Sequence, residues 1–309
     1  MRHCAAPNFR LATTLASGQT FRWQQVGEWY YGVLDGALIR VRQVDDELQW
    51  DTSDAHLTAE RLTHYFALDH DLEHILATID RDDHIHAAIV AYRGLRLMRQ
   101  EPWECLASYL LTSFNNIQRI TRMIENLSQH FGQSITCGSW QTYTFPPPEV
   151  LAEVPVGRLS LLGLGFRAAH LVEVARHVAS GAVRLETLHG RTYAEIKQTL
   201  TQLPGIGDKV ADCIALFAFQ CYAAFPIDVW TRRALALYLP RRDLTLKRMH
   251  AFASTQFGAY AGYAQQYLYH WLRTRAAWTR RSPVEVEHRT LSRWVLQPMQ
   301  VAPPLEPVA

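Results

Sequence analysis

The spacing of apolar residues changes once along the chain, near Leu57. Before this point, four short runs rich in aromatic and β-branched residues predict the strands of an antiparallel sheet. The runs are residues 20–23, 28–34, 37–42 and 47–50. Asp35-Gly36 lies between two of them, and this dipeptide is typical of a two-residue type I′ hairpin.

After Leu57 the apolar residues recur at spacings of three and four, which is typical of amphipathic helices. Helices are predicted over residues 83–98, 102–112, 115–131, 166–180 and 193–203. A sheet followed by a series of helices, rather than strands and helices in alternation, indicates an α+β fold. We therefore predict an antiparallel sheet packed on a mostly helical unit.

The length of the chain agrees with two units, because 309 residues are about twice the ~150 residues of an average domain. We place the sheet domain at residues 1–83 and the helical domain at residues 84–280. Residues 281–309 are predicted to form a C-terminal helix and a proline-rich tail. The 48% of hydrophobic residues allows a packed core and excludes a globally disordered chain.

The five cysteines limit the other classes of protein. They are widely spaced and form no Cys-x-x-Cys pair, so the sequence supports neither a disulfide framework nor a zinc ribbon. The N-terminus has no apolar stretch of signal-peptide length, and no segment reaches the ~20 apolar residues of a membrane span. We expect a cytoplasmic protein without membrane contact, associated with the nucleoid if its source is bacterial.

Residues 192–219 carry the clearest functional signal. A helix ends near Leu203, residues 204–207 form a tight hairpin, and an apolar helix begins near Asp208. Gly205 and Gly207 allow the backbone to approach a ligand closely, and the free amides at the start of the second helix suit a DNA phosphate. The alternative is an ordinary corner between two helices.

Lys209 lies in the first turn of this second helix. Lysine is rare in the chain, because only three of the 31 basic residues are lysines, and the positive end of a helix macrodipole disfavours a cation. A position that disfavours the ammonium form suits an amine that must be neutral to act as a nucleophile. The spacing is equally consistent with a lysine that binds a phosphate.

Asp228 follows Lys209 by 19 positions and directly precedes an apolar helix. The helix that begins near Asp208, followed by a returning loop, can bring this carboxylate beside Lys209, where it can stabilise a positive charge on a carbon under attack. Its alternative role is that of an N-cap, which contributes roughly 1 kcal/mol. Cys213 lies four residues after Lys209 and therefore on the same helix face, either as a core residue or as part of the same pocket.

These elements together resemble the helix-hairpin-helix DNA glycosylases, and most closely the 8-oxoguanine DNA glycosylase family. The resemblance covers roughly residues 9–275 and depends on a series of motifs in order. The motifs are residues 17–23, 115–120, 162–167, 203–213, 226–229 and 258–265. It implies a sheet domain like that of the TATA-binding protein packed on a helix-hairpin-helix glycosylase domain, which acts as a monomer on double-stranded DNA containing oxidised guanine.

The resemblance also assigns a reaction to Lys209 and Asp228. Lys209 would attack C1′ of the deoxyribose, expel the damaged base and leave a Schiff base that proceeds to strand cleavage by β-elimination. Asp228 would stabilise the oxocarbenium-like transition state. The nucleotide must first leave the duplex, because C1′ is inaccessible in stacked DNA. The implied enzyme is a bifunctional DNA glycosylase and abasic-site lyase of base-excision repair that needs no cofactor and no metal.

The same resemblance assigns the residues that bind the extruded base. Gln265 would read its Watson–Crick edge, and Cys213 and Tyr269 would stack on its two faces, with Tyr269 in place of a more common phenylalanine. The carbonyl of Gly18 would accept the N7–H that 8-oxoguanine has and guanine lacks. One hydrogen bond contributes only ~0.5–1.5 kcal/mol, so the unfavourable approach of that carbonyl to N7 of guanine must add to the selectivity.

Further residues are implied to bind DNA around the gap that the extruded base leaves. Phe166 aligns with an intercalating aromatic residue, and Arg119 and Arg167 align with arginines that contact the base left behind. Their alternative roles are a core aromatic residue and solvated charges on a helix. The other residues that we expect to contact DNA are Phe114, Asn115, Asn116, Gly205 and Gly207.

Three positions depart from the pattern of the family. Phe114 replaces an asparagine that begins a three-asparagine run reading the opposite cytosine in some relatives. Trp230 replaces a histidine that offers a polar or phosphate contact, and Leu272 replaces an aspartate that supports the base pocket. The preference for the opposite base is therefore left open by the sequence.

Other functions remain as alternatives. An alkylpurine glycosylase of the same fold lacks the hairpin lysine, so Lys209 argues against it. An endonuclease III-like enzyme for other oxidised bases commonly carries a four-cysteine iron–sulfur cluster after the aspartate, and no cysteine follows Cys221. A non-catalytic helix-hairpin-helix DNA-binding module would have no need for Lys209, Asp228 and Gln265 together.

Overall fold

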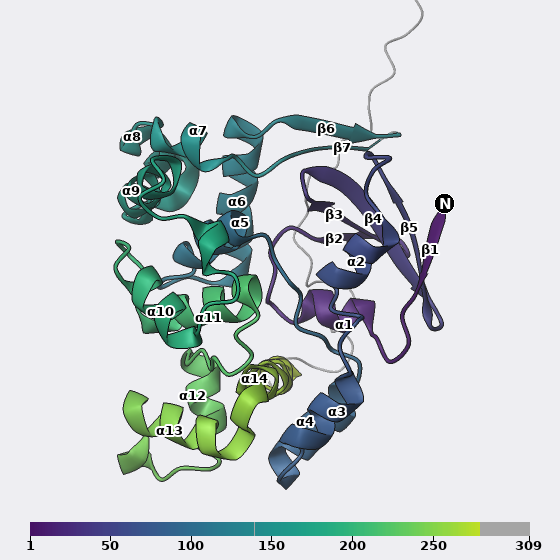
Figure 1. The fold of residues 1–309 in the computed structure, drawn as a ribbon, viewed down its shortest axis with the longest axis vertical. Helices are drawn as coiled ribbons and strands as arrows, with labels where there is room; N and C mark the ends of the chain where they lie inside the picture. The colour runs from purple at the N-terminus through teal and green to yellow at the C-terminus, as the bar shows by residue number, and fades with distance from the viewer. Residues whose placement is uncertain (139, 279–309) are drawn as a thin grey trace, which may run out of the picture.

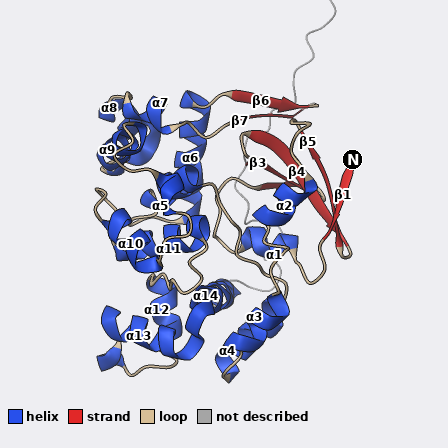
Figure 2. Ribbon diagram, viewed as in Figure 1, coloured by secondary structure: helices blue, strands red, loops and turns tan. Residues whose placement is uncertain are grey.

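The computed structural model describes residues 1–138 and 140–278. An antiparallel sheet lies on one side of the molecule and a group of helices on the other (Figures 1 and 2). The C-terminal helix and proline-rich tail predicted at residues 281–309 lie outside the described residues. None of the described helices is sufficiently long and apolar to span a lipid bilayer.

Among the described residues, five strands form the N-terminal sheet, in the order β1-β5-β4-β3-β2. They are β1 (Arg2–Ala5), β2 (Gln24–Val26), β3 (Trp29–Leu34), β4 (Ala37–Val44) and β5 (Glu47–Thr52). Each neighbouring pair is antiparallel, as predicted. Asp35 and Gly36 both have positive φ, 51° and 77°, which is the geometry of the predicted type I′ turn.

Two short helices, α1 (Leu11–Ala16) and α2 (Ala59–Tyr65), pack on this sheet. Their apolar side chains share a core with Val41, Leu48 and Trp50, which are at most 1% exposed. The predicted sheet domain therefore has a hydrophobic core of its own.

The strand predicted at residues 20–23 is wrong, because the chain is not paired there and β2 begins after it. Trp23 instead covers β3 so closely that a Cβ at Gly32 would lie 2.6 Å from its indole ring. Arg22, only 5% exposed, makes an ion pair of 3.0 Å with Glu104 in the helical unit. Of the aromatic residues that suggested a strand, Trp23 is buried in the core of the sheet unit and Phe21 in the core of the helical unit.

The rest of the described chain is mostly helical. The longer helices are α3 (Leu72–Ile79), α4 (Asp83–Tyr92), α5 (Pro102–Leu110), α6 (Ile117–Phe131), α9 (Arg167–Ala179), α10 (Tyr193–Thr201), α11 (Asp208–Phe219), α12 (Val229–Leu235), α13 (Leu246–Phe257) and α14 (Ala261–Trp278). The shorter helices α7 (Pro148–Ala152) and α8 (Val156–Leu159) precede α9. The predicted α+β architecture is confirmed.

The helix predicted over residues 83–98 is too long, since α4 ends at Tyr92. Gly94 follows with a φ of 94°, and the chain then runs without regular structure to residue 100. The backbone N–H of Gln100 donates to the carbonyl of Phe217 at 2.9 Å. The apolar residues in this stretch are buried between packed elements. Their spacing therefore resembles that of a helix although the chain is not helical there.

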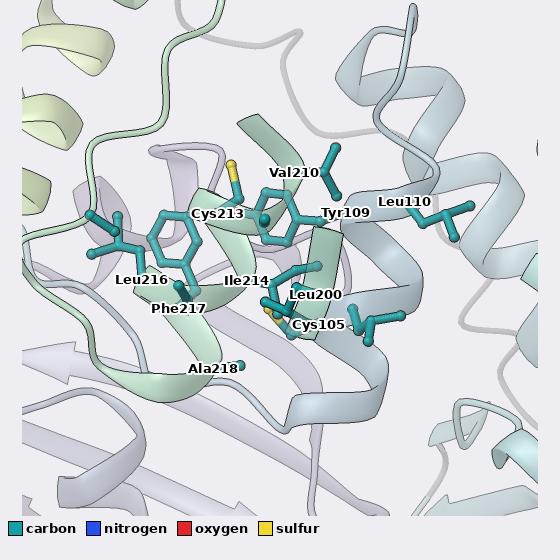
Figure 3. Packing of buried hydrophobic residues seen from close by; sticks show 14 of the residues in the cluster. Cys105, Tyr109, Leu110, Leu200, Val210, Cys213, Ile214, Leu216, Phe217 and Ala218 are labelled. Atoms are coloured by element: carbon teal, nitrogen blue, oxygen red, sulfur yellow. The ribbon is translucent and has the colours of Figure 1, made fainter. Parts of the chain in front are cut away.

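Helix α11 lies in the middle of the helical core (Figure 3). Ten of its twelve residues are buried. Phe217 stacks on Tyr109 of α5, with ring centres 5.5 Å apart and planes at 9°. Packing along its length fixes the position of its first turn, where Lys209 lies.

A second hairpin, β6 (Ser134–Cys137) and β7 (Trp140–Tyr143), was not predicted and joins the two units. Trp140 contacts Tyr31 of β3 with ring centres 4.6 Å apart. Helix α3 also belongs with the helical core, to which its buried leucine and isoleucine side chains contribute. The domain boundary at residue 83 stays a prediction.

Candidate active site

The turn between α10 and α11 forms a tight hairpin with a strict requirement for glycine at one position. Gly205 has a φ of 78°, and a Cβ there would lie 2.6 Å from Nδ1 of His170. Gly207 is the N-cap of α11, lies in open space and has no side chain to pair with the first amides of the helix. The start of α11 therefore offers backbone N–H groups to an anion, and the phosphate contact at Gly205 and Gly207 stays a prediction.

The two lysines near this hairpin have different surroundings. Nζ of Lys197 lies 2.9 Å from the carboxylate of the fully buried Asp212. In the described part of the chain, Lys209 makes no ion pair. Its Nζ donates to Oγ1 of Thr112 at 3.1 Å and lies 5.6 Å from the ring centre of Tyr109. The amine of Lys209 is thus held by neutral groups, whereas the positive charge of Lys197 is neutralised by the carboxylate of Asp212.

Asp228 lies at the start of α12. Its Oδ1 accepts a hydrogen bond of 2.7 Å from the backbone N–H of Thr231, so it is the N-cap that the sequence offered as one of its roles. The side chain is half-buried, and the cap occupies one oxygen. Capping does not exclude a second role, because the carboxylate has further lone pairs.

The charges of Lys209 and Asp228 act on the same two side chains. Burial raises the pKa of the Cys213 thiol to about 11, while Lys209 lowers it and Asp228 raises it. Burial also raises the pKa of Tyr269, on which Arg273 and Lys209 act in one direction and Asp228 in the other. The amine and the carboxylate therefore both lie close enough to Cys213 and Tyr269 for their charges to act on these two side chains.

Gln265 of α14 reaches toward this region and is only 5% exposed. Its Nε2 donates to Oγ1 of Thr231 at 2.9 Å, whereas its Oε1 is buried and has no hydrogen-bond partner among the described residues. A buried acceptor without a partner costs roughly 1–3 kcal/mol, so this oxygen indicates where the donor of a ligand belongs. Thr231 links Gln265 to the cap at Asp228, and sequence reasoning missed it although it lies three residues after the cap.

Gly18, predicted at the N7–H of the base, and Tyr269, predicted on one of its faces, both contact Arg273. A Cβ at Gly18 would lie 2.6 Å from Nη1 of Arg273, and the same nitrogen donates to the Tyr269 hydroxyl at 3.2 Å. Sequence reasoning missed Arg273 as well, because nothing in the local pattern distinguishes it from a solvated arginine.

Two aromatic side chains expected at the DNA are exposed. Phe114, in the turn between α5 and α6, is 95% exposed and has a φ of 50°, an unusual region for a bulky residue. Phe166, directly before α9, is 58% exposed. Neither side chain is part of the core, so the core alternative for Phe166 is wrong. Exposed aromatics with a strained backbone are typical of a binding surface.

The polar residues beside Phe114 are partly engaged within the protein. Asn116 caps α6 by accepting from the backbone N–H of Arg119 at 3.0 Å, and Asn115 donates to the carbonyl of Leu111 at 3.1 Å. The side chain of Arg119 is exposed. DNA contacts of these residues stay a prediction.

Arg167 is only 6% exposed and faces inward rather than toward solvent. Its Nε donates to the carbonyl of Ser113 at 2.9 Å, and its Nη2 donates to the carbonyl of Phe114 at 3.2 Å. Its guanidinium also lies 4.4 Å from the ring centre of Phe166. One arginine thus braces both exposed aromatics, and its predicted contact with the opposite base stays a prediction.

Comparisons with known proteins identify the family. A family model described as the N-terminal domain of 8-oxoguanine DNA glycosylase matches residues 3–106. The probable N-glycosylase/DNA lyase of Methanothermobacter thermautotrophicus is 30% identical over 297 residues, which cover 85% of this chain and 93% of that protein. The chain belongs to the 8-oxoguanine DNA glycosylase family.

Further similarities agree with this family. N-glycosylase/DNA lyase OGG1 of Arabidopsis thaliana is 31% identical over 282 residues, covering 84% of this chain and 76% of that protein. The Clostridium acetobutylicum 8-oxoguanine glycosylase/lyase, solved with double-stranded DNA containing cytosine opposite to 8-oxoguanine, has a TM-score of 0.82 at 27% identity. That match covers 89% of this chain and 99% of the other. As a family member, this chain is a bifunctional DNA glycosylase and lyase of base-excision repair.

Two departures from the 8-oxoguanine DNA glycosylase family can be placed in the fold. Trp230, in the first turn of α12, stacks with Arg233, whose guanidinium lies 4.6 Å from the ring centre. Leu272 is half-buried and packs against the helical core.

Among the described residues, no group of three or more His, Cys, Asp or Glu side chains could hold a metal ion.

Proposed function

We propose that the chain removes 8-oxoguanine from duplex DNA, with Lys209 as the nucleophile and Asp228 as the group that stabilises the transition state. The observation that carries this proposal is the shared neighbourhood of the two groups. Lys209, held by Thr112 without an acidic partner among the described residues, and Asp228 both act on Cys213 and Tyr269.

The reaction follows from an amine and a carboxylate on either side of a sugar. The lone pair of neutral Lys209 Nζ forms a bond to C1′, and the C1′–N9 bond breaks with its electron pair leaving on the base. The carboxylate of Asp228 stabilises the positive charge that develops on the sugar ring. Loss of protons from Nζ and opening of the sugar give the Schiff base, from which removal of a C2′ proton expels the 3′ phosphate.

The base pocket would use different chemistry on each side of the purine. The unpartnered Oε1 of Gln265 suits the N1–H and N2–H donors of a guanine edge, whereas adenine presents an acceptor at N1. Cys213 and Tyr269 would enclose the two faces of the ring. The Gly18 carbonyl would accept N7–H, the donor that marks the oxidised base.

The duplex would be bound by aromatic and basic groups around this pocket. Phe166 and Phe114 would fill the gap left by the extruded nucleotide, with the hairpin amides at Gly205 and Gly207 on a phosphate. Residues 229–248, directly after Asp228, contain six basic residues and one acidic residue, a formal charge of +5, whereas the remainder of the chain carries −3. All six basic side chains are exposed. This distribution favours an anionic partner beside the site.

The proposed partner is double-stranded DNA containing oxidised guanine, bound by a single copy of the chain. Such an enzyme would work in the cytoplasm, at the nucleoid of a bacterial cell. Phe114 offers no polar group to the opposite base, so we expect a weaker preference for cytosine than an asparagine would give.

Borohydride trapping tests this function directly. Reduction during turnover on a duplex with one 8-oxoguanine should give a covalent adduct, because borohydride converts a Schiff base between enzyme and DNA into a stable amine. The variant Lys209→Gln should give none, while Lys197→Gln, the matched control in the same hairpin, should still form it. Release of an alkylated purine without any adduct would instead identify a monofunctional glycosylase. Binding without base release would identify a DNA-binding module.

A further inference from the structure

Arg273 of α14 holds the ring that is proposed to cover one face of the base. It lies four residues after Tyr269 and so on the same face of the helix. Nη1 donates to the Tyr269 hydroxyl at 3.2 Å, and the guanidinium carbon lies 5.1 Å from the centre of the ring. These two contacts fix both the end and the plane of the Tyr269 side chain.

The same guanidinium reaches the turn that carries Gly18. Nη2 of Arg273 donates to the carbonyl of Ala16 at 2.7 Å, at the end of α1. Nη1 lies so close to Gly18 that any larger residue would collide with it. Two turns earlier on α14, Nε2 of Gln266 donates to the carbonyl of Ser17 at 3.0 Å. The turn is therefore held against α14 by two side chains, of which only Arg273 also contacts Tyr269.

The charge of Arg273 is not neutralised within the described residues, where it makes no ion pair. Its neighbours in the chain are Leu272 and Thr274, so the helix offers no adjacent carboxylate. The charge of Arg273 acts on the preceding turn of α14, where it opposes the rise that burial causes in the pKa of Tyr269 and adds to the fall that burial causes in the pKa of His270. The guanidinium has one carbonyl and one hydroxyl as its partners and no acidic group in the part of the chain that the structure describes. These contacts therefore fix the position of the side chain without neutralising its charge.

We propose that Arg273 is a positioning residue for recognition of the oxidised base, which acts by fixing Tyr269 and the Gly18 turn relative to each other. This inference rests on the proposed function. A carbonyl discriminates N7–H from a bare N7 only if it is held at hydrogen-bond distance, because both the attraction and the repulsion decline steeply as the atoms separate. Arg273 joins the carbonyl side of the pocket to its stacking side, two walls that come from opposite ends of the described chain.

The test compares two substrates of the same enzyme. Excision of 8-oxoguanine needs the base pocket, whereas β-elimination at a preformed abasic site needs Lys209 but no base. The variant Arg273→Met keeps the length of the side chain and loses its donors. It should lower kcat/KM for 8-oxoguanine duplex by about tenfold, as expected for one or two lost hydrogen bonds, and leave the rate on an abasic-site duplex unchanged.

Two further variants separate geometry from charge. Arg273→Lys keeps the positive charge but lacks the fork that spans two partners, so it should restore little of the lost kcat/KM. Tyr269→Phe removes one of the two partners and leaves the fold intact. Its effect should overlap with that of Arg273→Met, so that the double variant is less impaired than the product of the single losses.

The possible results lead to different conclusions. Equal losses on both substrates, or full rescue by Arg273→Lys, would overturn the positioning role, as would an unchanged kcat/KM in Arg273→Met. A wild-type enzyme that cleaves abasic sites but forms no adduct on 8-oxoguanine would instead overturn the proposed function.

Discussion

The hydroxyl of Thr231 accepts a hydrogen bond of 2.9 Å from the amide nitrogen of Gln265. Because the backbone N–H of the same residue donates to Asp228, the group that would read the base and the group that would stabilise the sugar share one support. Thr231 is fully buried, so neither bond competes with solvent. Thr231 thus supports both the side chain proposed to read the base and the carboxylate proposed to stabilise the transition state.

Removal of this hydroxyl should weaken base recognition before it affects chemistry. In Thr231→Val the Gln265 amide loses its internal partner, and KM for 8-oxoguanine duplex should rise about three- to tenfold with a smaller change in kcat. Thr231→Ser, which keeps the hydroxyl, should restore KM. Steady-state kinetics on both variants would contradict this view if valine and serine behaved alike.

The variant Asp228→Asn distinguishes the proposed catalytic role of the carboxylate from its role as the N-cap of α12. Asparagine is as good an N-cap as aspartate, so the midpoint of thermal unfolding should change little. The single-turnover rate of base excision should fall by orders of magnitude, because a neutral amide stabilises the cationic transition state poorly. Binding to damaged duplex should persist. A single-turnover rate equal to that of the wild type would reduce Asp228 to a structural cap.

Phe114→Asn should sharpen the choice of opposite base. The new amide can form hydrogen bonds with the base left behind, and asparagine also tolerates the positive φ of this position better than phenylalanine. Excision measured opposite each of the four bases should become more dependent on cytosine. Val90→Asn, a change at an exposed apolar residue of α4, is the control. A flat response at position 114 would remove this side chain from the interface.

The basic segment at residues 229–248 should contribute to affinity through phosphates. Replacing Arg241, Arg242 and Lys247 with serine should make the slope of log K against log salt shallower by about 2.7, if each contacts one phosphate. The single-turnover rate at saturating enzyme should stay the same. The control is the matched loss of three other exposed arginines. These are Arg81, Arg184 and Arg191. Equal changes of slope in the two sets would show that only net charge matters.

The stability of the protein should decrease as the pH falls below neutrality, in part because of His270. Burial lowers its pKa to about 4, with Arg273 adding to this effect, whereas an unfolded histidine titrates near 6.5. Between these values only the unfolded chain binds the proton, so the stabilising contribution present above pH 6.5 is lost as the pH falls toward 4. The expected loss from pH 7 to pH 5.5 is about 1 kcal/mol. Urea unfolding of His270→Phe should show a smaller pH dependence, and an unchanged dependence would exclude this residue as its source.

The local features of the site follow from sequence because neighbours in the chain determine them. The positive φ at Gly205 and the cap at Asp228 depend on a few adjacent residues, as does the type I′ turn at Asp35. Such features combine local preference with short-range hydrogen bonds, which residue type and spacing report well.

The features that sequence missed depend on distant partners. Arg167 had a solvated charge as its alternative role, yet its guanidinium is buried and bound by carbonyls 53 and 54 positions away. Thr231 and Arg273 have no local signature, because their partners come from other elements. The pattern at residues 83–98 failed for the same reason, since after Tyr92 the backbone N–H groups of Arg96 and Met98 donate to distant side chains instead of to helical carbonyls. Residue identity shows which bonds a side chain can form but not where the fold provides them.

The tether between α14 and the turn at Gly18 joins the two halves of the protein at its most selective point. Lys209 and Asp228, the proposed nucleophile and its carboxylate, both come from the helical half, whereas Gly18, proposed to recognise the oxidised base, comes from the other half. On this proposal, selectivity for damage depends on how firmly the two halves are held together. Substitutions far from the reacting sugar should then alter fidelity without altering strand cleavage.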